Sequence, residues 1–279
     1  MLRHFGPLAA KLPRKRRLSD RHGAADALPA QMEVRAVGAE ARAFGAQAQP
    51  SCVDEDLARA PQRPGHASQL PPSRAIADDW KHHEYYAEAE HWLAGFWDGS
   101  SAFRRFFDKI NRKDLLELAC GHGRHSAQII DSVDTLTLVD VNQENIDACR
   151  VRFAKYQNVR YIANNGNDLS AVAGGSQTGL FCYDAMVHFE ASDVIDYLSE
   201  ISRILTPGGR AVLHYSNMHW MPGVSYGDGP HMRNFFSENM MIHFAARNGL
   251  QTLEHTTLDW GSDPIWRDLD ALILLEKAL

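Results

Sequence analysis

The sequence has few cysteines, no long apolar run and no excess of positive charge. Its four cysteines among 279 residues share no CxxC spacing, so we expect buried, reduced thiols and no zinc site. No uninterrupted apolar stretch approaches the roughly 20 residues of a membrane span, and no membrane partner is expected. The formal net charge of −6 disfavours nucleic acid as a partner. A cytoplasmic protein is predicted, and the oligomeric state stays open.

Residues 1–79 lack the pattern of a folded domain. Their only aromatic side chains are Phe5 and Phe44, and no apolar period of 2 or 3.6 residues persists. Such a segment buries too little surface to offset its ordering entropy, so we predict a mostly disordered extension with a helical stretch near Gln31–Phe44. Its basic start fits an organelle-targeting peptide, an interaction tail or a solvated tail without a role.

Aromatic side chains become dense at Trp80. Their spacing predicts helices over residues 80–111, and Ser100 or Ser101 is placed to cap the second of them. Two interpretations remain open for this segment. The helices pack on a sheet, or they form a lid over a ligand pocket in which Tyr85 and Tyr86 face the ligand, and both can hold at once.

The chain from residue 112 to 279 alternates strand-like and helix-like runs. This alternation predicts an α/β fold with a parallel sheet. Two further extended runs, Leu250–Trp260 and Leu269–Ala278, have no helix between them and are predicted to pair antiparallel at the sheet edge. The other predicted strands are Asp114–Leu118, Thr135–Asp140, Val159–Asn164, Gly179–Met186 and Arg210–Tyr215.

A glycine-rich turn, in the stretch "LLELACGHGRHSAQ", follows the first of these strands and precedes a polar segment with helical character. Gly121 and Gly123 allow the backbone to approach a ligand at the carboxyl end of a strand. The dinucleotide pattern G-x-G-x-x-G is incomplete, because Ser126 occupies its third glycine position. Glu117 lies within the strand and favours a ligand with an amino group or positive charge.

Polar residues end the next two strands. A carboxylate at Asp140 can accept the two hydroxyls of a ribose, which fits several nucleosides and also NAD. Asn167 and Asp168 either bind an adenine edge or form a turn that caps the next helix.

These features in this order, with "LTPGG" before the fifth strand, resemble the class I S-adenosylmethionine-dependent methyltransferases over about residues 100–279. The resemblance implies a Rossmann-like, seven-stranded mostly parallel sheet with helices on both faces. It also implies S-adenosyl-L-methionine as cofactor. Ala119 departs from the family, where a third glycine is common, and is expected to be tolerated. The implied cofactor-binding residues are Glu117, Ala119, Gly121, Gly123, Asp140, Asn167, Asp168 and Cys182.

The end of the fourth strand, "LFCYDAMVHFE", carries polar groups where a plain strand would be apolar. Tyr183, Asp184 and His188 are the predicted catalytic residues. His188 has an intrinsic pKa suited to a general base, or else it caps a helix or packs under the lid. Asp184 is alternatively a buried partner that fixes the glycine turn.

A long loop, His214–Ser237, follows the fifth strand and is rich in polar and aromatic residues. We interpret it as a substrate loop, since long loops with this composition are commonly functional. Arg233 is expected to pair with an acceptor's carboxylate or phosphate, or to form a surface salt bridge. The spacing of the histidines matches no metal motif. The predicted substrate-binding residues are Tyr86, His214, His231, Arg233 and Asn234.

The sequence thus predicts an enzyme that transfers a methyl group to an O or N atom of a small-molecule acceptor. An NAD(P)-dependent oxidoreductase is one alternative, disfavoured by the incomplete glycine pattern. A non-catalytic binding module on the same fold is the other.

Overall fold

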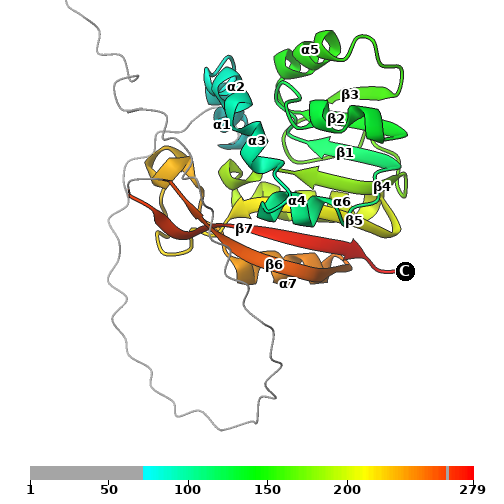
Figure 1. Cartoon of the computed structure of the whole chain (residues 1–279). Coiled ribbons are helices and arrows are strands. Elements are labelled where there is room, and N and C mark those ends of the chain that lie inside the picture. Colours follow the sequence, from blue (N-terminus) through cyan, green and yellow to red (C-terminus); the bar gives the residue numbers. More distant parts are fainter. Residues whose placement is uncertain (1–71, 262–263) are drawn as a thin grey trace, which may run out of the picture.

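One seven-stranded sheet forms the centre of the computed structural model, which describes residues 72–261 and 264–279 (Figure 1). The strand order is β3-β2-β1-β4-β5-β7-β6, in which β1 to β5 run parallel and β7 runs antiparallel to both neighbours. The predicted Rossmann-like sheet and its antiparallel C-terminal pair are confirmed. The strands are β1 (Asp114–Leu118), β2 (Thr135–Asp140), β3 (Val159–Ala163), β4 (Gln177–Cys182), β5 (Leu205–Ser216), β6 (Leu250–Trp260) and β7 (Trp266–Lys277).

Helices cover both faces of this sheet because successive strand side chains point to opposite sides. Leu116 and Leu118 join a core that includes residues of α6 (Ala191–Ile204) and α7 (Glu238–Arg247). Leu115 faces the opposite core, which is shared with the helices α4 (Ala102–Phe107) and α5 (Gln143–Arg152). The central strands are therefore buried on both sides. Within the described residues, each helix is too short or too polar to cross a bilayer.

Three short helices lie beyond the carboxyl ends of the parallel strands: α1 (Pro72–Trp80), α2 (Tyr85–Glu88) and α3 (Leu93–Phe96) (Figure 1). The predicted extension over residues 1–79 is therefore wrong for residues 72–79. Ile76 and Ala77 are buried, and the Ala77 carbonyl accepts a hydrogen bond of 2.8 Å from the Asn142 side chain. These tertiary contacts order a segment for which the composition alone predicts disorder. The remainder of the predicted extension, with its helical stretch, lies outside the described residues.

The glycine turn and the fourth strand differ locally from the predictions. The turn is followed by two 3-10 turns, Ser126–Gln128 and Ile130–Ser132, in place of an α-helix. The side chains of Arg124 and Ser126 bind buried carboxylates here, and these tertiary bonds override helical propensity. β4 ends at Cys182, four residues before the predicted end, because Asp184 adopts a left-handed conformation with φ of 57° and leaves the sheet.

Candidate active site

The glycine turn has the left-handed backbone that glycine favours. Gly121 and Gly123 have φ of 52° and 74°, and a Cβ on Gly123 would lie 2.6 Å from the Phe153 ring. Side chains are therefore excluded at Gly123 on both conformational and steric grounds. Ala119 also has a positive φ, of 56°, so the position where the family often has glycine keeps the glycine-type conformation with the smallest side chain.

Asp140 ends β2 directly below this turn and is buried. Its carboxylate accepts hydrogen bonds from the Gly121 amide at 2.9 Å, the Asn142 amide at 2.9 Å and the Asn145 side chain at 3.0 Å. Burial raises the pKa of Asp140 above its usual value, and these hydrogen bonds oppose the shift. A carboxylate offers about four acceptor sites, so roughly one remains for a ligand.

Glu117 is buried within β1 and accepts a hydrogen bond from the Ser126 hydroxyl. Burial raises the pKa of Glu117 to about 8. The carboxyl is therefore mostly protonated at neutral pH, and a cation placed beside it would favour its ionised form.

A cavity opens between the glycine turn, the ends of β2 and β4, and the helices α1 and α2. It encloses about 990 Å³ of space between atoms, its open mouth included. Two buried acceptors in its lining, Asn142 Oδ1 and Asn164 Oδ1, have no hydrogen-bond partner. An unpaired buried polar atom is costly, so both amides contribute polar character to this wall without a partner from the described residues.

Four predicted cofactor residues, Gly123, Asn167, Asp168 and Cys182, do not line this cavity. Asp168 accepts hydrogen bonds from the amide and hydroxyl of Ser170, and Asn167 donates to Asp196, so both lie in a local turn. The alternative that this turn caps a helix is wrong, because the next element is the strand β4. Asn164 and Gly166, slightly earlier in the same segment, line the cavity instead. Cys182 is completely buried and packs in the sheet core.

The residues after β4 form the opposite wall of the cavity. Asp184 accepts a hydrogen bond from the Tyr85 hydroxyl of α2 and is paired with Arg124 at 2.5 Å. Burial alone would raise the pKa of Asp184, but the Arg124 guanidinium holds it below its usual value. The alternative of a buried partner that fixes the glycine turn therefore describes Asp184. Tyr183 is buried beside it and stacks on Phe103, with ring centroids 4.0 Å apart.

His188 also lines the cavity, and its Nδ1 lies 2.9 Å from the Met232 carbonyl oxygen. A carbonyl oxygen only accepts, so Nδ1 carries the proton and Nε2 is unprotonated in the neutral ring. Burial lowers the pKa of His188 to about 4, so the ring is neutral at physiological pH and is a weaker base than the intrinsic pKa of histidine predicts. Its ring packs on Trp80 of α1, with centroids 4.8 Å apart.

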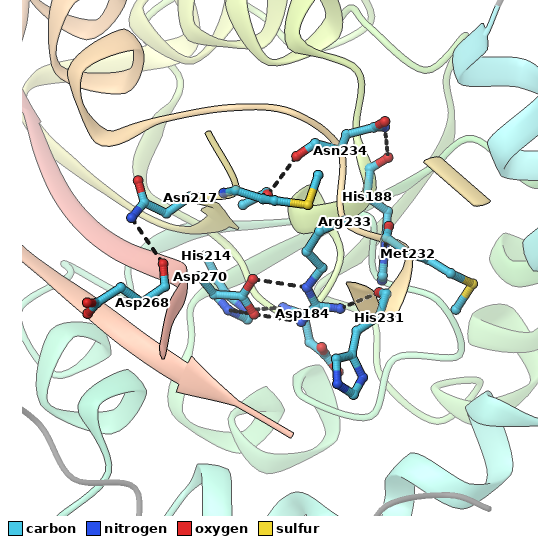
Figure 2. Close-up of polar contacts among 12 residues, drawn as sticks. Asp184, His188, His214, Asn217, His231, Met232, Arg233, Asn234, Asp268 and Asp270 are labelled. Carbon is cyan, nitrogen blue, oxygen red and sulfur yellow. Dashed lines mark hydrogen bonds and ion pairs between the residues drawn. The ribbon is translucent and has the colours of Figure 1, made fainter. Parts of the chain in front are cut away.

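The predicted substrate residues divide into two groups. Tyr86 lines the cavity, where its ring stacks on His122 with centroids 4.3 Å apart. The other four lie outside the lining and hold the loop after β5 in place (Figure 2). Arg233, for example, is buried and pairs with Asp270 at 2.9 and 2.6 Å. Arg233 thus forms a salt bridge as one alternative predicted, but the bridge is buried and not at the surface, and its carboxylate belongs to Asp270 of β7 and not to an acceptor.

His214, Asn234 and His231 complete this second group. His214 is fully buried, accepts from the Asp184 amide at 3.1 Å, and contacts Asp270 at 3.2 Å. Asn234 donates to the His188 carbonyl at 2.7 Å, and the His231 carbonyl accepts from Arg233 at 2.9 Å. Among the described residues, no group of three or more His, Cys, Asp or Glu side chains is arranged to hold a metal ion.

Sequence reasoning missed three residues that shape the site. Asp270 is a carboxylate inside the apolar run "LDALILLEK", and Arg124 is a cation beside two glycines, so both patterns carried a signal. Asn142 follows Asp140 by two residues and carries no distinctive pattern.

The comparisons with known proteins agree with this geometry. Residues 115–209 match a family model described as a methyltransferase domain, and none of the curated proteins matches the chain significantly. The geranyl diphosphate C-methyltransferase of Streptomyces coelicolor A3(2) is similar, with a TM-score of 0.59 and 16% identity over 77% of this chain and 100% of that one.

Two other solved structures show the same fold. An S-adenosylmethionine-dependent methyltransferase of Methanosarcina mazei has a TM-score of 0.50 and 15% identity, covering 63% of this chain and 97% of its own. The [4+2]-cyclase SpnF has a TM-score of 0.50 and 12% identity, covering 62% and 78%. At these identities the structures establish the fold alone. Taken with the matching family model, they show that the chain resembles the class I S-adenosylmethionine-dependent methyltransferases in its fold and over residues 115–209.

Proposed function

We propose that the protein transfers a methyl group from S-adenosyl-L-methionine to an O or N atom of a small-molecule acceptor. The observation that carries the proposal is the buried Asp140 carboxylate, which lines the cavity beside a left-handed glycine turn. An acidic residue at the end of the second strand suits the ribose of a nucleoside. With about one acceptor site left, Asp140 would take one ribose hydroxyl.

The polar residues of the cavity wall would hold the other parts of the cofactor. Asn142 and Asn164 line the cavity, and a nucleoside supplies hydroxyl and amino hydrogens that amide side chains can bind. Glu117 and the glycine turn would hold the amino acid part of the cofactor. Bound in this way, S-adenosylmethionine supplies an activated methyl group, so alignment and exclusion of water are the main tasks of the surrounding residues.

The acceptor end of the cavity favours a molecule without a carboxylate or phosphate. Arg124 is committed to Asp184, and Arg233 is committed to Asp270 outside the lining. Aromatic rings from α1 and α2, such as Trp80 and Tyr85, line the cavity and favour an apolar or planar acceptor. His188, with Nε2 unprotonated, is the proposed base for the acceptor's proton.

Calorimetric titration of the full chain with S-adenosylhomocysteine tests the cofactor assignment, with NAD as the control. We expect micromolar binding of the first and none of the second. Asp140→Asn keeps the side-chain volume but replaces an acceptor with an amide donor, so we expect roughly 10- to 100-fold weaker binding, from the loss of a hydrogen bond to a charged group. Unchanged affinity in Asp140→Asn, or binding of NAD, would contradict the proposal.

A further inference from the structure

Two consecutive residues in the loop after β5 hold a backbone conformation that side chains disfavour. His231 and Met232 have φ of 49° and 57°, although neither is glycine. Left-handed conformations of this kind persist only where surrounding contacts enforce them, and they occur frequently at functional sites. The contacts that enforce this turn therefore indicate what the turn is for.

Both carbonyl groups of the turn are bound by named partners (Figure 2). The His231 carbonyl accepts from Arg233 Nη1 at 2.9 Å, and the Met232 carbonyl accepts from His188 Nδ1 at 2.9 Å. One carbonyl thus attaches the turn to Arg233, and the other attaches it to a residue of the cavity wall.

Arg233 is itself fixed from the far side by β7. Its guanidinium pairs with both oxygens of Asp270, and the side chains of the two residues are 3% and 0% exposed. The guanidinium also lies over the Trp260 ring, 4.8 Å from its centroid. A buried ion pair contributes little net stability, because desolvation offsets the attraction. The two hydrogen bonds to Asp270, in contrast, fix the plane of the Arg233 guanidinium and so the direction in which Nη1 donates.

Asp270 also contacts His214, whose ring accepts a hydrogen bond from the backbone amide of Asp184 in the cavity wall. The Asp184 amide donates to His214 Nδ1, so the His214 proton is on Nε2, which faces Asp270 at 3.2 Å. Asp270 therefore contacts two lines of hydrogen bonds, one that ends at the Asp184 backbone and one that ends at the His188 ring.

We propose that Arg233 and Asp270 are positioning residues for His188. Their ion pair holds the strained His231–Met232 turn so that the Met232 carbonyl binds Nδ1–H of His188, which fixes Nε2 as the unprotonated nitrogen of a ring that lines the cavity. This inference rests on the proposed function for its purpose, since the unprotonated nitrogen is the one that takes the acceptor's proton.

The ring nitrogens of His188 report this directly in the ligand-free, ¹⁵N-labelled full chain at pH 7. Long-range ¹H–¹⁵N spectra distinguish the two neutral tautomers, and the signals of His188 are those missing from His188→Gln. We expect a single tautomer protonated at Nδ1 in the wild type. Arg233→Lys keeps the charge but loses the planar fork, so we expect a mixture of tautomers. Retention of the single tautomer in a folded Arg233→Lys protein would overturn the inference.

A second pair of variants changes the turn and leaves the ion pair intact. If Arg233→Lys does not fold, this pair alone tests whether the turn fixes the tautomer of His188. Met232→Gly keeps the carbonyl and tolerates the left-handed backbone, so the single tautomer is expected to persist. Met232→Val is β-branched and disfavours that backbone, so a mixture is expected. Identical spectra for the two variants would also overturn the inference.

Arg267→Gln is the matched control, because Arg267 pairs with Asp259 on the same strand pair but is 71% exposed. It is expected to leave the His188 signals unchanged. Titration of each protein with S-adenosylhomocysteine separates the two proposals. Loss of the single tautomer in the variants, together with binding of S-adenosylhomocysteine by the wild type, supports both proposals. Absence of wild-type binding with the expected tautomer changes would contradict the proposed function alone.

Discussion

Buried carboxyl groups at neighbouring positions of the cavity have opposite ionisation tendencies. Burial raises the pKa of Glu117 to about 8, and the hydrogen bond from the neutral Ser126 hydroxyl offsets only part of this effect. Asp184 is also buried, but the Arg124 guanidinium holds its pKa below the usual value. The difference is set by the partner and not by depth. Of these two carboxyl groups, Glu117 is the one that becomes ionised when a cationic ligand enters the cavity.

Binding of S-adenosylhomocysteine at pH 7 is expected to release most of one proton from Glu117. With a pKa of about 8 the free carboxyl is largely protonated, and the ligand's ammonium group would favour the carboxylate. The measurement is titration calorimetry in buffers with different ionisation enthalpies. The sign follows from the raised pKa: affinity should increase as the pH rises towards about 8 and then level off.

Glu117→Gln provides the comparison for this effect. The variant has no proton to release, so its apparent binding enthalpy should be the same in every buffer. Buffer-independent enthalpy in the wild type would show that Glu117 does not face the ligand's ammonium group.

At the scale of single elements, the helices near the cavity are short, and hydrogen bonds at their ends contribute much of their stability. α4 has only six residues, and the Ser101 hydroxyl accepts from the Arg104 amide at 3.0 Å and donates to the Phe96 carbonyl at 2.6 Å. Of the two serines proposed as caps from the sequence, Ser101 makes the cap. Ser100 bonds to Asp98 in the preceding turn. The cap therefore joins α3 to α4.

Ser101→Ala is expected to destabilise the protein by about 1 kcal/mol, the usual effect of removing an N-cap. Urea-induced unfolding, followed by circular dichroism, measures the change. Ser100→Ala is the matched control and should change the stability by less than about 0.5 kcal/mol, because Ser100 is exposed. Equal effects of the two substitutions would contradict the assignment of the cap.

At the scale of the whole molecule, the cavity joins parts that are distant along the chain. Its walls come from α1 and α2, the glycine turn, β2 and the segment after β4. A ligand that contacts all of them stabilises the native state and not the unfolded chain. Binding and global stability are therefore coupled.

S-adenosylhomocysteine at about 100 times its Kd should stabilise the protein by about 2.7 kcal/mol. For a chain of this size, this corresponds to an increase in Tm of roughly 5–10 °C. Differential scanning calorimetry of the full chain measures it, with an equal concentration of NAD as the control. A shift of the same size with NAD would point to a dinucleotide site.

The sequence by itself determined the sheet and the place of the site. The bounds of β1 and β2 follow directly from their apolar patterns, and the antiparallel pair follows from two extended runs without an intervening helix. Gly121 and Gly123 identified the ligand end of β1, because backbone conformation and close approach are local properties that the residue type records.

Only the tertiary structure decided which polar side chains face the cavity and which hold its walls. Arg233 looked available for a substrate, yet its charge is taken by Asp270, which lies 37 positions later in the chain. Residues 72–79 looked disordered, yet they form most of a helix in which Ile76 and Ala77 are buried and the Ala77 carbonyl accepts from the Asn142 side chain. In both cases the partner is remote in sequence. Charge pairing and burial depend on distance in space, which local composition does not encode.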